Sequence, residues 1–254
     1  MRTIAVTGSA SGLGAAVVRR MRYMRHRVIG IDRRDADIDA DLATPDGRAL
    51  AVKGVLDCCG GKLEGLVPCA GIGPHVKNSA KIAAINYFGA VAMLDGLKAA
   101  LGAGVAPAAV VISSNSATTV PIGDHAFVDA CLAGEEEYAV ELAARHDGAT
   151  IYGNSKLALA QAVRERAKDW GAAGVRLNAV APGPFDSALL QAGLDDPEMG
   201  PLIEAYPIPL ERRGTADEIA DAIEFLLSAH ATWIHGIVLF VDGGTDALLN
   251  PTRL

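Results

Sequence analysis

The sequence has no long apolar stretch without charge. A membrane-spanning helix needs about 18 or more such residues in a row, and no segment of the chain approaches that length, so no membrane span is expected. The N-terminal "MRTIAVTGSASG" also lacks the charged, apolar and small-residue regions of a signal peptide. These absences predict a cytoplasmic protein.

Positive charge is scarce. The chain has 23 lysines and arginines against 30 aspartates and glutamates, a net charge of −7. A nucleic-acid-binding protein needs a basic face, so the composition argues against a nucleic-acid partner. Half of the residues are hydrophobic, which predicts a substantial core rather than disorder.

Cysteine is scarce too, and its spacing is uninformative. Cys58, Cys59, Cys69 and Cys131 form no Cys-x-x-Cys pair and no zinc pattern. We therefore expect reduced thiols that pack and no metal site. The run Glu135–Glu137 favours a solvated helix start over a metal site.

The chain does contain apolar, strand-like segments that alternate with helical ones. This alternation is typical of βαβ units, in which helices cover both faces of a parallel sheet. The sequence predicts an α/β fold, a single domain over residues 1–254 with a doubly wound parallel sheet (Rossmann fold). The expected strands are 3–8, 27–32, 65–71, 107–116, 175–183 and 236–244, and the expected helices are 15–24, 83–101, 153–170 and 216–228.

The first strand ends in the glycine-rich turn "TGSASGLG". Between a strand and a helix, Gly8 permits a tight turn, Gly12 lets the backbone approach a pyrophosphate, and Gly14 lets helix and strand pack closely. The helix N-terminus then faces the phosphates of a dinucleotide. Thr7, Ser11 and Leu13 are expected at the same cofactor site.

Asp32 ends the second strand, where a carboxylate can accept hydrogen bonds from the adenosine ribose. It would repel a 2′-phosphate, so NAD(H) is favoured. Arg33 and Arg34 follow directly and could pair with that phosphate, so NADP(H) remains open. Asp41, followed by Leu42, could bond the adenine amino group, or it could be a solvated loop acid.

The segment "TIYGNSKLAL" places Tyr152 and Lys156 four residues apart, on one face of a helix. Alone this pair is a weak motif. It gains weight from the ordered set "TGSASGLG", Asp32, Cys69-Ala70-Gly71, Asn86 in "NYFG", Ser114 in "ISS", "YGNSK", "APG" (181–183) and "VDGG" (241–244). In this order, over nearly the whole chain, the sequence resembles the short-chain dehydrogenase/reductase family.

The resemblance implies an NAD(H)-dependent oxidoreductase. Tyr152 would exchange a proton with the substrate oxygen, its pKa lowered by the Lys156 ammonium and the oxidised cofactor. Ser114 would orient that oxygen, with Ser113 and Ser116 as rivals for the role. Lys156 would also hold the nicotinamide ribose, and Asn86 would anchor a water that links Lys156 to solvent.

Two places depart from the family pattern. The usual Asn-Asn-Ala-Gly reads Pro68-Cys69-Ala70-Gly71, so that strand end must be supported differently, with Cys69 expected to pack. The usual threonine after Pro182-Gly183 reads Ser187, which keeps a hydroxyl for the cofactor. The bulky Phe185 is expected to flank the nicotinamide.

About 37 residues separate Ser114 from Tyr152, more than in most of the family. The insertion, about 117–149, has helical stretches at 124–133 and 134–146. With "LLQAGLDDPE" and the C-terminal segment, it resembles a narrower group, the bacterial 3α-hydroxysteroid dehydrogenases/carbonyl reductases and the coniferyl-alcohol dehydrogenases. If the insertion blocks the helix that relatives use for tetramers, a homodimer is expected, though a tetramer stays open.

A loop at about 184–213 mixes apolar residues with loop-formers and is expected to be a mobile lid over a hydrophobic substrate. The group resemblance implies a secondary alcohol/ketone pair on a bulky substrate such as a 3α-hydroxysteroid. The alternatives are an aromatic allylic alcohol of the coniferyl type, or an NAD-binding sensor without turnover. The expected pocket residues are Pro74, Ser114, Thr118, Phe185, Leu189, Leu190 and Met199.

Overall fold

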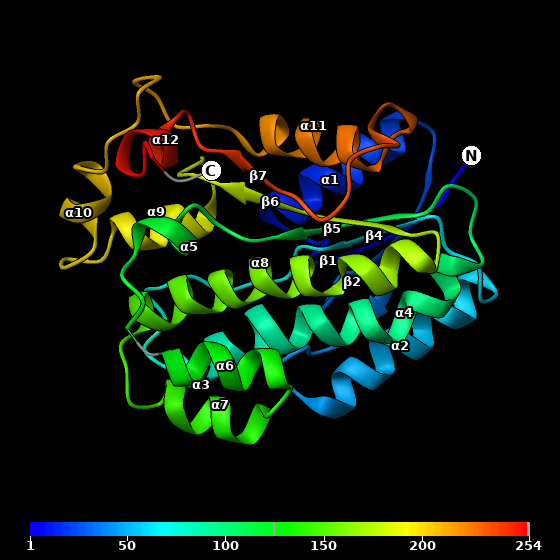
Figure 1. Ribbon diagram of the computed structural model, residues 1–254, viewed down its shortest axis with the longest axis horizontal. Coiled ribbons are helices and arrows are strands. Elements are labelled where there is room, and N and C mark those ends of the chain that lie inside the picture. Colours follow the sequence, from blue (N-terminus) through cyan, green and yellow to red (C-terminus); the bar gives the residue numbers. More distant parts are fainter. Residues whose placement is uncertain (124, 253–254) are drawn as a thin grey trace.

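The computed structural model describes residues 1–123 and 125–252. Within them, seven parallel strands form one sheet (Figure 1). The strands are nearly continuous apolar runs, as expected where a sheet is buried on both faces. This confirms the predicted doubly wound parallel sheet. In spatial order the strands are β3 (Ile38–Asp39), β2 (Arg27–Asp32), β1 (Thr3–Thr7), β4 (Gly65–Pro68), β5 (Ala108–Ile112), β6 (Arg176–Pro182) and β7 (Val238–Val241).

Helices cover both faces of the sheet. The helices α1 (Gly12–Tyr23) and α11 (Ala216–Leu227) pack on one face, in a core with Val6, Val110 and Ile223. The other face carries a larger core with Leu66, Val111 and Leu159. Figure 1 shows the two layers above and below the strands. The second layer consists of α2 (Pro45–Cys59), α3 (Ser79–Ala83), the π-helical segment η1 (Ala84–Gly89), α4 (Ala90–Gly102) and α8 (Gly148–Ala172).

The insertion forms α6 (His125–Ala133) and α7 (Glu136–Ala143), close to the two predicted helical stretches. Position 124, where the first stretch was expected to start, lies outside the described residues. The helix α6 packs against α8, and α7 packs against α3. Consequently the first half of α8 is enclosed, and residues 151–160 are buried or largely buried.

The structure differs from the sequence-based expectation at three helices. The helix α2 was missed because its apolar side chains do not follow one clear stripe. The helix α8 begins at Gly148, five residues before the expected start, because Asp147 caps it by accepting from the Thr150 amide at 2.8 Å. The expected helix 83–101 is part of a longer helical segment that runs from Ser79 to Gly102. Its middle turn, η1, is π-helical rather than α-helical.

The remaining helices are short and lie near the carboxyl end of the sheet. They are α5 (Ser116–Thr119), α9 (Ala188–Leu194), α10 (Gly200–Glu204) and α12 (Thr245–Leu249). The 3₁₀ turn η2 (Ala229–Ala231) instead follows α11 at the amino end of the sheet, where Arg176 at the start of β6 donates to the Leu227 and Ser228 carbonyls. The helices α9 and α10 lie in the segment expected to be a lid. No helix within the described residues is long and apolar enough to cross a membrane.

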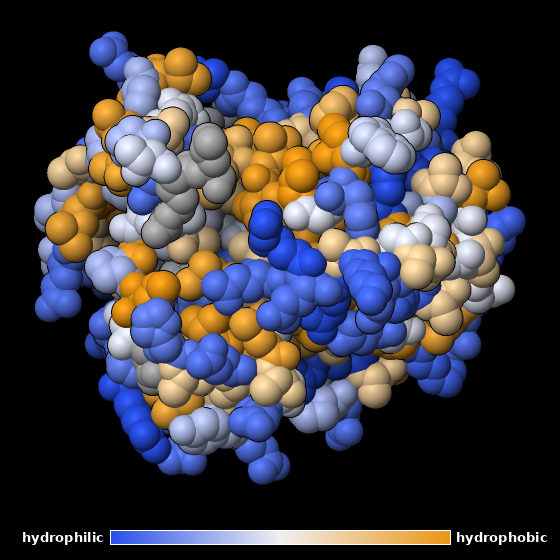
Figure 2. Space-filling model, in the orientation of Figure 1, coloured by the Kyte–Doolittle hydropathy of each residue, from blue (hydrophilic) through white to orange (hydrophobic). Residues whose placement is uncertain are grey.

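The last strand leaves an apolar edge. All four residues of β7 are partly exposed, and the Trp233 side chain in the preceding turn is 99% exposed. Phe225 of α11 is 41% exposed. Figure 2 shows apolar surface in the upper middle of the view, in the region of β7 and α11. Contiguous apolar surface of this kind is typical of a contact face.

Candidate active site

A cavity of about 410 Å³ opens beside the carboxyl ends of β1, β4, β5 and β6. The strand order reverses between β1 and β4, and such a switch point is where doubly wound sheets bind ligands. The glycine-rich turn lines one part of the cavity, and apolar residues of α9 and α10 line another. Ser114, Tyr152 and Lys156 also line it, so the predicted cofactor, catalytic and substrate regions share one space.

The three glycines of the turn have distinct geometries. Gly8 has φ +68°, and a Cβ there would meet the backbone of Ala70 at 2.9 Å. Gly12 has φ +52°, and a Cβ there would meet nothing within 4 Å, so its backbone is open on the cavity side. A Cβ on Gly14 would overlap the carbonyl group of Gly8. The first and third glycines are therefore needed for packing, and the second leaves room for a ligand.

Four residues expected near the adenosine end lie outside the cavity. The Asp32 carboxylate accepts from the Ala10 amide at 3.0 Å, which joins the end of β2 to the glycine-rich turn. Arg33 is exposed beside it. Asp41 accepts from the Ala43 amide at 3.0 Å, and Leu42 is buried against Gly89.

The departure at Pro68-Cys69-Ala70-Gly71 is supported by neighbouring side chains. The Thr7 hydroxyl accepts from the Ala70 amide at 3.0 Å. The next segment is held by Asn86, whose amide accepts from the Ile72 N–H at 2.9 Å and donates to the Ile72 carbonyl at 3.0 Å. Burial raises the pKa of the Cys69 thiol to about 12, so Cys69 is a neutral thiol rather than a nucleophile.

Asn86 reaches this position from the π-helical turn η1 and is fully buried. A π-helical turn widens the helix locally and is frequent at functional sites. A Cβ on Gly71 would lie 3.3 Å from the Asn86 Oδ1 and 3.8 Å from the Lys156 Nζ. Both side chains thus converge on one glycine at the edge of the cavity.

The hydroxyl groups of the three serines after β5 differ in their hydrogen bonds. The Ser113 hydroxyl donates to the Lys156 carbonyl at 2.8 Å, so it is committed to holding α8. Ser114 accepts from the Ser116 amide at 3.2 Å and forms a side-chain hydrogen bond with Tyr152. The Ser116 hydroxyl is buried and has no partner among the described residues. This geometry favours Ser114 over its two rivals beside Tyr152.

Burial dominates the electrostatics of Tyr152 and Lys156. It raises the pKa of the Tyr152 phenol, and the hydrogen bond to Ser114 only partly opposes this. It lowers the pKa of the Lys156 ammonium to about 8. The expected lowering of the Tyr152 pKa involves the oxidised cofactor as well as Lys156, so it stays a prediction for the cofactor complex. In the protein alone, desolvation sets the direction. The Lys156 Nζ lies 5.7 Å from the Tyr152 ring centre and donates to the Ile112 carbonyl at 2.8 Å.

Most of the expected substrate and nicotinamide-side residues line the cavity. They are Pro74, Pro182, Gly183, Phe185, Ser187, Leu189, Leu190 and Met199. The Ser187 hydroxyl accepts from the Leu190 amide at 3.1 Å and caps α9. Thr118 is an exception: it does not line the cavity, because its hydroxyl bonds Asp246 of α12.

Sequence reasoning missed part of this wall. Ile72, Ser116, Thr119, Leu202, Ile203 and Tyr206 line the cavity as well. A helical pattern at 116–119 would have turned Thr119 rather than Thr118 inward, but four residues are too few to show a period. Tyr206 lies among loop-formers and gave no signal.

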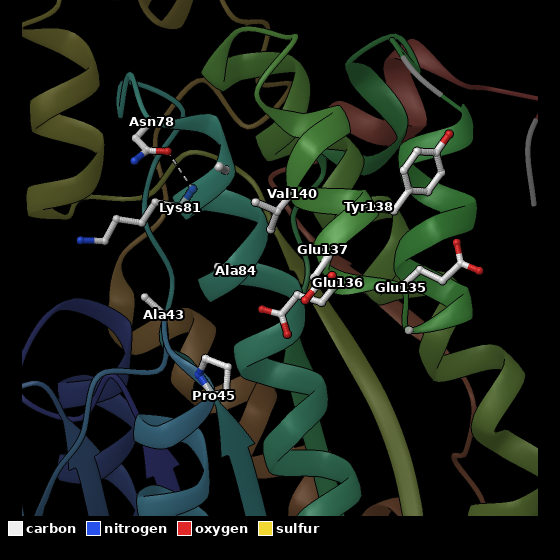
Figure 3. Close-up of a pocket in the computed structure, with 12 residues that line it drawn as sticks. Ala43, Pro45, Asn78, Lys81, Ala84, Glu135, Glu136, Glu137, Tyr138 and Val140 are labelled. Carbon is white, nitrogen blue, oxygen red and sulfur yellow. Dashed lines mark hydrogen bonds between the residues drawn. The ribbon is translucent and has the colours of Figure 1, made fainter.

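A second hollow lies where the insertion meets the main fold (Figure 3). It is lined by the start of α2, by α3 and by the first turn of α7, which carries Glu135–Glu137. Two of its polar side chains are engaged in the fold: Glu136 accepts two hydrogen bonds at 2.8 Å from the buried Arg48, and Asn78 caps α3 at the Lys81 amide. The described residues contain no group of three potential metal ligands.

Comparisons with known proteins agree with this geometry. The family model described as "Enoyl-(Acyl carrier protein) reductase" matches residues 137–246. The chain is 43% identical over 256 residues to the 3α-hydroxysteroid dehydrogenase/carbonyl reductase of Comamonas testosteroni, covering all of both chains. It is 27% identical over 253 residues to a coniferyl-alcohol dehydrogenase of Pseudomonas sp. strain HR199, covering 96% of each.

Among solved structures, the chain is similar to a 3α-hydroxysteroid dehydrogenase from Pseudomonas sp. B-0831 complexed with NADH. The TM-score is 0.97 at 49% identity, with 99% of this chain and all of that chain covered. The aldohexose dehydrogenase of Thermoplasma acidophilum has a TM-score of 0.78 at 24% identity over all of this chain and 96% of that one, and it supports the fold alone.

Proposed function

The chain belongs to the short-chain dehydrogenase/reductase family and is a nicotinamide-dependent alcohol/ketone oxidoreductase, and on this premise we propose that it acts on a bulky hydrophobic secondary alcohol or ketone of the 3α-hydroxysteroid type, with NAD(H) as cofactor. One observation carries the proposal. Ser114, Tyr152 and Lys156 line the same cavity as the open glycine-rich turn and a largely apolar wall. A hydrophobic alcohol and a dinucleotide can therefore meet at the phenol.

The residues fit a dinucleotide. Gly12 has a positive φ and free space where a Cβ would point, so its backbone can be approached closely by a pyrophosphate. The cofactor would be held by this turn, by Asp32 at the ribose, by Ala70 and Gly71, and by Ser187 and Lys156. When bound, the nicotinamide accepts the hydride from the substrate carbon or returns it.

The choice of NAD(H) rests on Asp32. Its carboxylate lies against the glycine-rich turn through the Ala10 amide, where it would repel a 2′-phosphate. Of the two arginines that follow, Arg34 lies 3.9 Å from Asp35 and both are exposed. Exposed arginines compete less well for the ribose than a carboxylate fixed by two backbone amides, those of Ala10 and Arg33.

The proton moves at the Tyr152 hydroxyl. In reduction the phenol gives its proton to the carbonyl oxygen, and in oxidation the phenolate takes the alcohol proton. The Ser114 oxygen accepts from the Ser116 amide, and its O–H, which bonds Tyr152 in the protein alone, would donate to a substrate oxygen placed between the two hydroxyls and orient it. Lys156 lies beside the ring as a cation that stabilises the phenolate when it forms.

The substrate class follows from the cavity wall opposite these groups. Leu189, Leu190 and Met199 contribute to it from α9 and the turn before α10. Apolar lining with few polar groups favours a bulky hydrophobic molecule. The full-length similarity to a 3α-hydroxysteroid dehydrogenase/carbonyl reductase supports the steroid type.

The test is reduced-nicotinamide absorbance with purified protein, NAD or NADP, and an alcohol panel. We expect turnover of a 3α-hydroxysteroid with NAD, and inertness of the 3β epimer. Turnover of coniferyl alcohol alone would replace the steroid reading with the aromatic allylic one. If no alcohol in the panel is oxidised although NADH binds tightly, the catalytic proposal is contradicted and an NAD-binding sensor is favoured.

We also propose a homodimer. The enclosed first half of α8 leaves no face there for a second copy, because α6 covers it. The apolar edge at β7, with Trp233, is the face that we expect a partner copy to cover (Figure 2). Small-angle scattering should give a dimer, whereas a tetramer packed through α8 would contradict this arrangement.

A further inference from the structure

Three hydroxyl-bearing residues that line the cavity have no role in the proton transfer. Ser116 and Thr119 lie three residues apart on the short helix α5 and so share a face. Tyr206, just after α10, reaches Thr119, and the two oxygens are 2.6 Å apart. All three residues line the cavity, whose other walls near them are formed by residues such as Val120, Leu202 and Ile203. A polar strip therefore runs along an apolar chamber.

The protons of this strip can be assigned. The Thr119 hydroxyl donates to the Asn115 carbonyl at 3.1 Å, which uses its one proton. Tyr206 must then donate to Thr119, and its oxygen keeps a lone pair for a further donor. If instead Thr119 turns its proton to Tyr206, the phenol proton is free for an acceptor. The pair can thus accept a hydrogen bond from a ligand hydroxyl or donate one to a ligand keto oxygen.

The Ser116 hydroxyl beside this pair lacks a hydrogen-bond partner among the described residues, and its oxygen is buried. A buried hydroxyl without a partner is destabilising, and such groups are commonly completed by a ligand or an ordered water. Burial also raises the pKa of Tyr206, so its phenol is protonated at neutral pH.

We propose that Thr119 and Tyr206, with Ser116 beside them, form a polar subsite that hydrogen-bonds a second oxygen of the substrate, distinct from the reacting one. The inference rests on the proposed function, since it places a bulky alcohol in this cavity. The preferred substrate class is then a hydrophobic secondary alcohol or ketone that carries a hydroxyl or keto group elsewhere on its skeleton. Because Thr119 and Tyr206 satisfy each other, a substrate without that group is accepted, but less well.

The test compares matched alcohols that differ only in the second oxygen. One pair is a 3α-hydroxysteroid with and without a 17-keto group, and the other is 4-(4-hydroxyphenyl)cyclohexanol with 4-phenylcyclohexanol. Dissociation constants are measured by calorimetry on the NADH-bound protein, where an alcohol cannot react, and kcat/KM is measured with NAD. We expect the oxygenated member of at least one pair to be favoured about tenfold, the worth of one hydrogen bond.

Variants separate recognition from a mere contact of the loop. Tyr206→Phe and Thr119→Val should each bring the ratio within a pair close to one, whereas Thr119→Ser should retain it. Tyr138→Phe is the matched control, because Tyr138 lies on α7 outside this cavity. An equal loss for both members of a pair in Tyr206→Phe would show that the residue only holds the loop, and would overturn the subsite.

The two proposals fail differently. Turnover of these alcohols with a wild-type ratio near one in both pairs would leave the dehydrogenase standing and refute the subsite. A tenfold ratio of dissociation constants, lost in Tyr206→Phe but without any turnover, would support the subsite and refute the proposed reaction. Failure of all four alcohols to bind would refute both.

Discussion

The Nζ of Lys156 lies 5.7 Å from the centre of the Tyr152 ring, one helical turn away on α8. Both side chains are enclosed, so each charge state is costly unless the other group offsets it. Burial raises the pKa of the phenol and lowers that of the ammonium. The phenol is therefore neutral at rest, while Lys156, with a pKa of about 8, is still a cation at neutral pH, so the phenolate forms where a cation is already beside it.

Replacing Tyr152 with phenylalanine removes the proton donor and keeps the ring. We expect Tyr152→Phe to lower kcat by about 10²–10⁴-fold, the usual worth of a positioned acid or base. NADH binding, followed by fluorescence, should change little. Substantial retained activity would refute the role of the phenol.

Lys156 predicts a dependence of stability on pH. Its pKa falls from 10.5 to about 8 on folding, so between these values the unfolded chain binds more protons than the folded one. Stability therefore rises with pH from about 8 to about 10.5, by up to about 3 kcal/mol from this group. Urea unfolding at pH 7.5 and 10 should show a more favourable change in stability in the wild type than in Lys156→Met, because groups with a raised pKa such as Cys69, which oppose the gain, titrate in both proteins. An equal pH response in both proteins would contradict the assignment.

Asp32 and Arg33 can be weighed against each other by cofactor preference. Asp32→Ala should narrow the ratio of kcat/KM for NAD over NADP, because the carboxylate that repels a 2′-phosphate is lost. Arg33→Ala is the matched control and should leave that ratio high. If only the arginine variant changes the ratio, ribose selection lies with Arg33.

Gly12 and Gly14 should respond differently to alanine. At Gly12 the new methyl group has free space, so the fold is retained at a cost of about 1 kcal/mol for the positive φ, and cofactor affinity falls. At Gly14 it would overlap the Gly8 carbonyl group, which should destabilise the protein by about 3 kcal/mol or more. Thermal unfolding and NADH titration of both variants separate the two effects, and similar unfolding temperatures would be inconsistent with the turn as described.

The ion pair between Arg48 and Glu136 should hold the insertion in place. The Arg48 side chain is only 7% exposed, and Glu136 is 32% exposed. Glu136→Gln leaves a buried cation without its counter-charge, so we expect a loss of about 1–3 kcal/mol in unfolding free energy. Glu137→Gln, at the next position of α7, is the control. Equal effects of the two substitutions would mean that the ion pair contributes nothing specific.

Sequence reasoning located the sheet, and it named Ser114, Tyr152 and Lys156, which the structure brings to one cavity, because both follow regular sequence patterns. Both ends of the strand 27–32 were predicted correctly, because a short apolar run that ends in Asp32 favours a buried strand over other structures. The wall of the substrate cavity followed no such pattern. Tyr206 becomes part of it only because a loop far along the chain lies against Thr119, and that contact depends on tertiary packing.

The electrostatics of the site could not be predicted from spacing either. The four-residue spacing places Tyr152 and Lys156 on the same face of the helix. It does not determine how completely the neighbouring elements exclude water from these side chains. The sign of the pKa change of Tyr152 is set by that exclusion, and the elements packed on α8 include α5, α6 and α3. Only the assembled fold contains this information.

The π-helical turn that carries Asn86 also fixes the number of residues between α3 and α4. Such a turn holds one residue more than the α-helix around it, so α3 and α4 are out of step by a single amino acid. Deleting one residue within 84–89 would restore an ordinary helix, because the wider turn absorbs the extra residue without changing the relative orientation of α3 and α4. Asn86 would then lose the widened turn from which it bonds Ile72, so the one extra residue of this helix fixes the edge of the active site.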